Sequence, residues 1–186
     1  LLHVYTDGSI MINHGGTEMG QGLHTKICQV VARELGLDLD SVRISATRTD
    51  KVPNTSPTAA SSGADLNGMA ARDAASKLRE RLFEFAAGHF EGGLDREGMR
   101  LEHGMLIAGI GESERRIPWG ELVQTAYLNR VSLSEKGFYA TPLIHYNRAT
   151  GQGRPFYYYA FGAAVAEVSV DTLSGEYLVD RVDVLH

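Results

Sequence analysis

The stretch "LHVYTDGSIMINHGGTEMGQGLHTKICQVVAREL" (residues 2–35) holds two short apolar segments, a glycine-rich loop and an amphipathic segment in direct succession. Asp7-Gly8 between the two apolar segments is typical of a β-hairpin turn. The residues after Gly22 recur at helical spacing, and Gly36 is a natural end for a helix. We therefore predict a hairpin and a helix over 22–35. The apolar face of that helix comprises Leu23, Ile27, Val30, Val31 and Leu35.

The same patterns assign the rest of the chain. A short strand is predicted around Val42 and Ile44, and a turn-rich segment follows over 51–63. A long helix over 64–87 carries one apolar face, namely Leu66, Ala70, Ala74, Leu78, Leu82 and Phe85. Further predictions are a small hairpin over 99–109, a short helix with Pro118 in its first position, and two strands over 155–186 joined by a Ser-Gly turn. The fold class is α+β, with helices packed on a mixed β-sheet.

Composition narrows the class of protein. The 186 residues include 18 basic and 23 acidic ones, a formal charge of −5, and no basic stripe, which disfavours nucleic acid or an anionic membrane as partner. Cys28 is the only cysteine, so the chain has no internal disulfide and suits a reducing, cytoplasmic compartment. The sequence at both ends has a strand pattern with no exposed polar tail, so we expect the chain to be a portion of a larger protein.

The glycine-rich loop "GGTEMGQGLHTK" (15–26) fails two nucleotide-binding patterns. A P-loop needs lysine and a hydroxyl after its last glycine, and Leu23 and His24 stand there. A dinucleotide fingerprint needs glycine or alanine where Thr25 stands. Free amides at a helix start, together with the Gln21 amide, still suit an anion. The alternative is a loop that only turns the chain.

A second loop, "NTSPTAASSGAD" (54–65), also opens a helix and is rich in hydroxyls and small residues. Two such helix starts separated by a strand are expected to face each other at one end of the sheet. Together they would hold a large, polar, phosphate-bearing ligand through amides, although some of these hydroxyls serve as helix caps.

Other chemistry-bearing residues favour ordinary structural roles. The seven histidines show no ligand spacing for a metal, and Cys28 lies among apolar helix positions. Glu167 within an apolar strand is a candidate base, but a hydrogen-bonded or edge glutamate is the simpler interpretation. The aromatic run "PFYYYAF" (155–161) is interpreted as strand packing.

Four longer motifs carry a resemblance to a known family. "HGGTEMGQGLHTK", "VPNTSPTAASSGADLNG", "GFYATPLIHYNRATGQGRPFYYYAFGAA" and "AEVSVDTLSGEYLVDRVDVLH" resemble the molybdopterin-binding subunit of the xanthine dehydrogenases, in the molybdenum hydroxylase family. The resemblance runs almost from end to end and is weakest over 88–117, which we interpret as a variable insertion. It implies that residues 1–186 form one lobe of a molybdopterin-binding domain, truncated at both ends.

The resemblance implies a set of cofactor-binding residues. These are Gly20, Gln21, Thr58, Ala60, Ser61, Ser62 and Gly63, with Ala60 closest to the ligand sphere of the metal. It implies no catalytic residue and no metal ligand within the chain, because the family's catalytic glutamate and substrate-contacting residues fall outside the matching segments. The 186 residues alone are therefore expected to be inactive.

The resemblance also implies the wider enzyme. The family hydroxylates hypoxanthine and xanthine to urate with oxygen from water, using a molybdenum–molybdopterin cofactor. Electrons pass to iron–sulfur clusters, FAD and NAD in partner parts of the enzyme, so the expected partners are an iron–sulfur/FAD subunit, a purine substrate and further copies in an oligomer. Two alternatives stay open: aldehyde oxidase or another N-heterocycle hydroxylase, and a non-catalytic assembly module.

Overall fold

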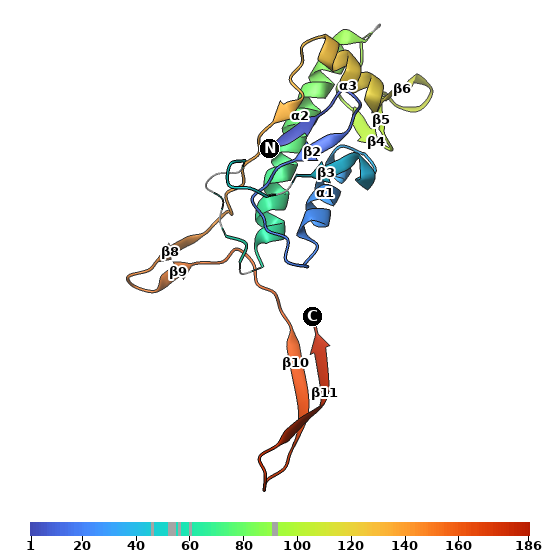
Figure 1. Ribbon diagram of the computed structural model, residues 1–186. Coiled ribbons are helices and arrows are strands. Elements are labelled where there is room, and N and C mark those ends of the chain that lie inside the picture. Colours follow the sequence, from blue (N-terminus) through green and yellow to red (C-terminus); the bar gives the residue numbers. More distant parts are fainter. Residues whose placement is uncertain (46, 52–54, 56, 60, 91–92) are drawn as a thin grey trace. The chain divides into compact units, whose positions relative to one another are not determined.

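A computed structural model describes residues 1–45, 47–51, 55, 57–59, 61–90 and 93–186. The chain forms two compact units, residues 1–140 and 141–186. Helices and several small sheets alternate along it, which confirms the α+β class (Figure 1). In the described residues no helix is long and apolar enough to cross a membrane.

The first unit starts with the predicted hairpin, β1 (Leu2–Val4) and β2 (Ile10–Ile12), paired antiparallel. Its turn is stabilised by Asp7, whose Oδ1 accepts hydrogen bonds from the amide and the hydroxyl of Ser9. Gly8 has φ +85°, a conformation that glycine adopts without steric cost. The Asp-Gly signal therefore predicted this turn correctly.

Helix α1 (Leu23–Glu34) carries the chain from β2 to β3 (Val42–Ile44), with the one-turn helix η1 (Leu39–Ser41) before β3. Strand β3 lies parallel to β2, as a helical crossover between neighbouring strands allows. The short strand β7 (Ser134–Glu135) pairs antiparallel with β1. The sheet order is β3-β2-β1-β7, so the sheet is mixed, as expected.

Helix α2 (Gly63–His89) extends along the sheet beside α1 (Figure 1). The predicted apolar face is confirmed at Ala74, Leu78 and Leu82, which are fully buried, whereas Leu66, Ala70 and Phe85 are partly buried. Burying a leucine side chain contributes about 1.5–3 kcal/mol, so this face anchors the helix to the core. The largest fully buried side chains among the described residues are Leu2, Ile10, Ile12, Leu23, Ile27, Val31, Leu35, Leu78, Leu82, Leu106, Leu122 and Val123.

The region from residue 93 onward contains a three-stranded antiparallel sheet. It consists of β4 (Arg100–Glu102), β5 (Met105–Ala108) and β6 (Arg115–Pro118), with the turn η2 (Gly111–Ser113) before β6. The hairpin over 99–109 is confirmed, whereas the third strand was not predicted. That the segment 88–117 is a variable insertion stays a prediction.

Helix α3 (Trp119–Leu128) starts one residue later than the sequence indicated. Pro118 was placed in its first turn, but its ψ of 141° is extended and it ends β6, so that assignment was wrong. The helix is tied to the first hairpin because the Trp119 Nε1–H donates a 2.8 Å hydrogen bond to the carbonyl of Gly8.

The second unit consists of two hairpins (Figure 1). The first, β8 (His145–Asn147) with β9 (Gln152–Arg154), was not predicted. The second, β10 (Ala163–Val170) with β11 (Tyr177–Leu185), confirms the strand–turn–strand pattern. The aromatic residues of 155–161 precede β10 and are exposed, so their interpretation as a packed strand was wrong.

A bulge gives the β10–β11 hairpin two different faces. The pairing passes from Glu167–Arg181 to Val168–Val179, which leaves Asp180 as the extra residue. Because directly paired residues share a face, the bulge places one apolar set together, namely Ala164, Ala166, Val168, Val170, Tyr177, Val179, Val182 and Val184. On the other face Ser169 donates to Asp180, and Arg181 pairs with Asp183.

Candidate functional site

The loop between β2 and α1 is organised by Glu18. Its Oε1 accepts hydrogen bonds from the amides of Gly20 and Gly22, both at 2.9 Å, and its Oε2 accepts one from the amide of His24 at 3.0 Å. These bonds favour the carboxylate form, so they lower the pKa of Glu18, the bond from His24 having the largest effect. The sequence predicted that such amides would be open to an external anion, whereas three of them already bind Glu18.

Gln21 stabilises the same loop by bonding to the backbone of the residues that precede it. Its Oε1 accepts a hydrogen bond from the Met19 amide at 2.6 Å, and its Nε2 donates to the Thr17 carbonyl at 2.9 Å. Gly20 and Gly22 have φ of +97° and +71°, and no described atom lies within 4 Å of where a Cβ would stand on either. The loop therefore presents bare backbone on a surface that a ligand can approach closely.

The two glycine- and hydroxyl-rich loops meet as predicted. The Thr17 amide donates a 2.8 Å hydrogen bond to Oγ1 of Thr58. Ser61, which follows in the second loop, has φ +56°, a left-handed conformation that is uncommon for a residue with a side chain and recurs at functional sites. The Ala60 prediction lies outside the described residues.

Helix α2 starts at this second loop without a side-chain cap. Ser62 is the N-cap residue, but its hydroxyl donates to the Ala59 carbonyl and, within the described part of the chain, makes no cap bond to the helix. The amides of the first turn of α2 are therefore left for a ligand or water. Helix α1 differs, since Glu18 takes the amide of His24 in its first turn and that of its N-cap residue, Gly22.

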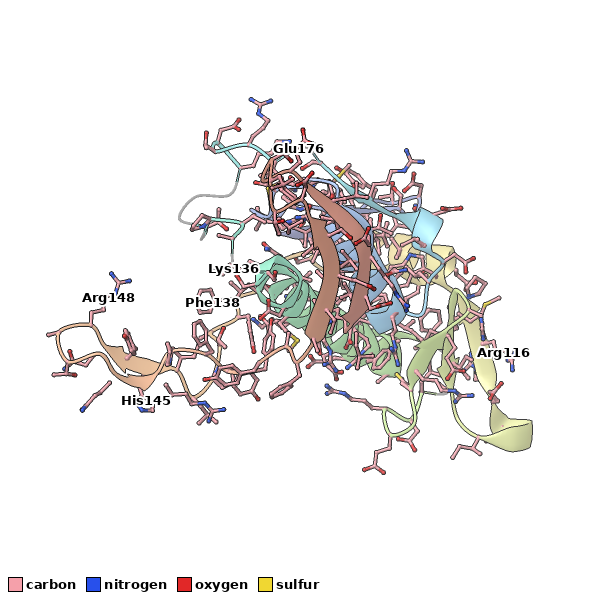
Figure 2. All side chains as sticks on the ribbon, turned by 90° about the horizontal axis from the view of Figure 1, so that it is seen from below. Arg116, Lys136, Phe138, His145, Arg148 and Glu176 are labelled. Atoms are coloured by element: carbon pink, nitrogen blue, oxygen red, sulfur yellow. The ribbon has the colours of Figure 1, made fainter. Side chains whose placement is uncertain are left out.

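Two cavities adjoin the start of α2. We call the first the loop cavity; it measures about 330 Å³ and is lined by Met19, Gln21, Leu23, Lys26, Thr58, Ala59, Ser61, Gly63 and Ala64. The second, the sheet cavity, measures about 290 Å³ and extends between α2 and the β1–β2 hairpin. Its polar lining comprises Asn13, His14, Thr55, Thr58, Ser62 and Asn67, and Phe138 and Tyr139 line it as well. Phe138 lies beside α2, where its amide donates to Asp73 (Figure 2).

The structure brings most of the predicted site residues together. Gln21, Thr58, Ser61 and Gly63 line the loop cavity, and Ser62 lines the sheet cavity together with Thr58 and Gly63. Gly20 is not among the described residues that line either cavity, although it lies next to Gln21 in the loop.

Sequence reasoning missed His14, which is only 8% exposed and lines the sheet cavity. Its Nδ1 accepts the Gly16 amide at 3.0 Å, which assigns the proton of the neutral ring to Nε2. That Nε2 is buried and has no hydrogen-bond partner among the described residues. Burial and the neighbouring His24, 5.2 Å away between ring centroids, lower the pKa of His14 to about 4. The only sequence signal for this residue is its position directly before Gly15-Gly16, at the start of the glycine-rich loop.

The other residues considered as chemical candidates, Cys28 and Glu167 among them, have contacts that suit a structural role. Throughout the described ranges, no group of three or more His, Cys, Asp or Glu side chains is placed to hold a metal ion. Cys28 packs against the core, and burial raises the pKa of its thiol. Glu167 is exposed on β10 and pairs with Arg181 across the hairpin.

The donors around the loop cavity define the ligand that fits. They are hydroxyls, backbone amides and the second N–H of the Gln21 carboxamide, and Lys26 is the single cation among the described lining residues. The uncapped start of α2 favours negative charge, and the carboxamide both donates and accepts. This arrangement suits a large polar molecule that carries a phosphate, held mainly through uncharged groups.

Comparison with known proteins identifies relatives. The molybdopterin cofactor-binding domain family matches residues 1–186. Xanthine dehydrogenase/oxidase of Gallus gallus is 43% identical over 185 residues, and xanthine dehydrogenase of Dictyostelium discoideum is 44% identical over 188 residues. Each match covers the whole of this chain and 12% of the relative, so the chain spans about an eighth of the length of these curated relatives.

Solved structures share the fold. Quinoline 2-oxidoreductase of Pseudomonas putida 86 aligns with a TM-score of 0.75 and 24% identity over 98% of this chain and 22% of its own. CO dehydrogenase of Oligotropha carboxidovorans aligns with a TM-score of 0.74 and 22% identity over 98% of this chain and 21% of its own. At this identity the likeness concerns the fold.

Proposed function

The chain belongs to the molybdopterin cofactor-binding domain family, and we propose that it is a pterin-binding part of a xanthine dehydrogenase. The observation that carries the proposal is the meeting of the two loops at the uncapped start of α2. The donors gathered there fit a large polar anion, and the family supplies the identity of that anion.

We propose that the cofactor is held by the residues that the motifs indicated. Gln21 and Gly20 present the first loop, and Thr58, Ser61, Ser62 and Gly63 present the second, with Ala60 between them in sequence. Thr58 supplies a hydroxyl, and the first turn of α2 supplies amides and the positive end of its dipole. The glycines let the ligand touch backbone, which side chains would prevent.

When bound, the molybdenum–molybdopterin cofactor would supply a redox-active metal, and the residues of this chain would bind and orient it. Gln21 cannot turn freely, because both ends of its carboxamide already bind the loop backbone. Ser61 has a left-handed backbone conformation with φ +56°, which is uncommon for a residue with a side chain and recurs at functional sites. Such preorganisation lowers the entropic cost of binding.

The xanthine dehydrogenase branch is proposed because the relatives named above at 43–44% identity carry that name. On this proposal the full enzyme hydroxylates hypoxanthine and xanthine in the cytoplasm. FAD, iron–sulfur clusters and NAD would act in its partner parts, and an iron–sulfur/FAD subunit would dock onto it. The 186 residues alone would be inactive, because the catalytic glutamate of the family falls outside the matching motifs.

Expression in a host that makes molybdopterin tests the cofactor assignment. We expect molybdenum and pterin to co-purify with the 186-residue chain, and the doubly substituted Thr58→Ala, Ser61→Ala variant to retain less of both. The matched control is Ser113→Ala, which changes a hydroxyl far from the loops in sequence. Absence of pterin from the wild-type chain would favour a non-catalytic assembly module.

Activity tests the second half of the proposal. The isolated chain is expected to leave hypoxanthine and aldehydes unchanged. Hydroxylation of either by the 186 residues alone would show that the catalytic groups lie within them.

A further inference from the structure

We propose that Glu18 is the positioning residue of the β2–α1 loop, holding Gly20 and Gln21 in the conformation that meets the ligand. The identity of that ligand rests on the function proposed above, whereas the role of Glu18 in the loop rests on its own contacts.

The first support is the number of bonds that converge on one side chain. Glu18 binds the amides of Gly20, Gly22 and His24, all within 3.0 Å. Hydrogen bonds to an ionised carboxylate are stronger than those between neutral groups. One carboxylate thus holds both sides of Gln21 in the sequence and the first turn of α1.

The second support is that the N-cap residue of α1 cannot accept these hydrogen bonds with a side chain. Gly22 is the N-cap residue of α1 and has no side chain with which to accept a hydrogen bond. Glu18 reaches back from four residues earlier and brings negative charge to the positive end of the helix. Removal of this carboxylate leaves those amides to water.

The third support is that residues 19–22 have few other contacts with the described part of the chain. Gly20 and Gly22 have open space where side chains would lie, so packing does not fix their positive φ angles. The Gln21 carboxamide binds Met19 and Thr17 within the same loop, so it cannot anchor the loop to the rest of the protein. The Thr17–Thr58 hydrogen bond joins the first loop to the second, so the conformation of the first loop affects where the second one lies.

The test uses the 186-residue chain without cofactor and measures amide exchange residue by residue. In Glu18→Gln we expect the amides of Gly20, Gly22 and His24 to exchange roughly threefold to tenfold faster, because exposed charge-assisted bonds are of modest strength. Core amides of α2 serve as an internal reference for global unfolding. Glu121→Gln, an exposed glutamate in the first turn of α3, is the matched control and should leave these rates unchanged.

A second variant separates charge from mere bulk. Glu18→Asp keeps the carboxylate on a shorter side chain, so it should restore part of the protection and of the pterin retention that Glu18→Gln loses. Unchanged exchange of the three amides in Glu18→Gln would overturn the positioning role. A wild-type chain that takes up no pterin, yet shows the exchange difference, would overturn the proposed function and leave Glu18 as the residue that orders the loop.

Discussion

The amide of Thr17 donates a 2.8 Å hydrogen bond to Oγ1 of Thr58, 41 residues further along the chain. The bond joins the loop that precedes α1 to the loop that precedes α2. Since Thr58 also lines both cavities, the same hydroxyl links the position of the loops to the shape of the site.

Thr58→Val removes this hydroxyl while keeping the shape of the side chain. We expect a loss of at most about 1 kcal/mol in the free energy of unfolding, because the bond is exposed. Pterin retention should fall by a larger factor than stability does, since the hydrogen bond that joins the two loops is lost. Thr58→Ser keeps the hydroxyl and serves as control; equal pterin retention in both variants would contradict a role for this bond.

Gly137 is expected to be intolerant of any side chain. A Cβ there would lie 1.8 Å from the Ala70 carbonyl oxygen and 2.7 Å from the Ala74 amide, both on α2. Gly137→Ala should therefore lower the free energy of unfolding by about 1–3 kcal/mol and displace the neighbouring Phe138 from the sheet cavity.

Gly120→Ala is the matched control for this substitution. Gly120 lies in α3, and nothing described stands within 4 Å of an added Cβ. Alanine is favoured over glycine in a helix, so this variant should gain roughly 0.5–1 kcal/mol in stability by denaturant unfolding. A stable Gly137→Ala protein would show that the 137–139 segment shifts without cost.

Stability is expected to depend on pH through His14. Its folded-state pKa of about 4 lies below the ordinary value of 6.5, so between these values the unfolded chain binds a proton that the folded chain does not. The contribution is therefore fully present above pH 6.5 and is lost as the pH falls toward 4. The loss is on the order of 3 kcal/mol.

Chemical denaturation at several pH values between 4.5 and 7, roughly the window between these two pKa values, measures this effect. His14→Gln should unfold with a weaker pH dependence than the wild-type protein across that window. His145→Gln, on the exposed strand β8, should keep the wild-type dependence. An unchanged slope in His14→Gln would show that other groups produce it.

The apolar face of the β10–β11 hairpin is expected to drive self-association of the 186-residue chain. Val168, Val179 and Val182 lie on this face and are 52%, 52% and 57% exposed. A two-stranded hairpin with such a face is marginal in water unless it is covered. Sedimentation should reveal species larger than one chain, and Val168→Glu should reduce them.

Glu167→Gln is the control for this prediction, because Glu167 is paired with Arg181 on the opposite face of the hairpin. It should leave the sedimentation profile unchanged. A wild-type chain that remains monomeric at high concentration would contradict the prediction.

The elements that the sequence predicted well are those with strong local signals. Asp7-Gly8 determined the turn of the first hairpin, and helical spacing identified α1 and α2 to within about two residues. The missed elements lack such signals: β8 and β9 are three residues each and carry no apolar alternation. Pro118 was misplaced because proline suits both the end of an edge strand and the first turn of a helix.

The site divides in the same way. Motifs indicated which residue types gather at the two loops, and the contact between Thr17 and Thr58 agrees with the expectation that these loops face each other. Spacing could not show that Glu18 would occupy the amides at the start of α1, because that depends on the left-handed turns at Gly20 and Gly22. It also could not show that Ser62 would leave α2 uncapped.

By itself, the sequence determined the order of the helices, the residue types of the two loops before α1 and α2, and the family, because these depend on local periodicity and on residue identity. Only the tertiary structure decided which polar groups remain available. Glu18 and Gln21 are engaged within their own loop, whereas the Nε2 of His14 is buried without a described partner. The physical reason is that availability depends on which donors and acceptors meet in space, and residues 14, 18 and 21 meet theirs through backbone turns that no spacing rule encodes.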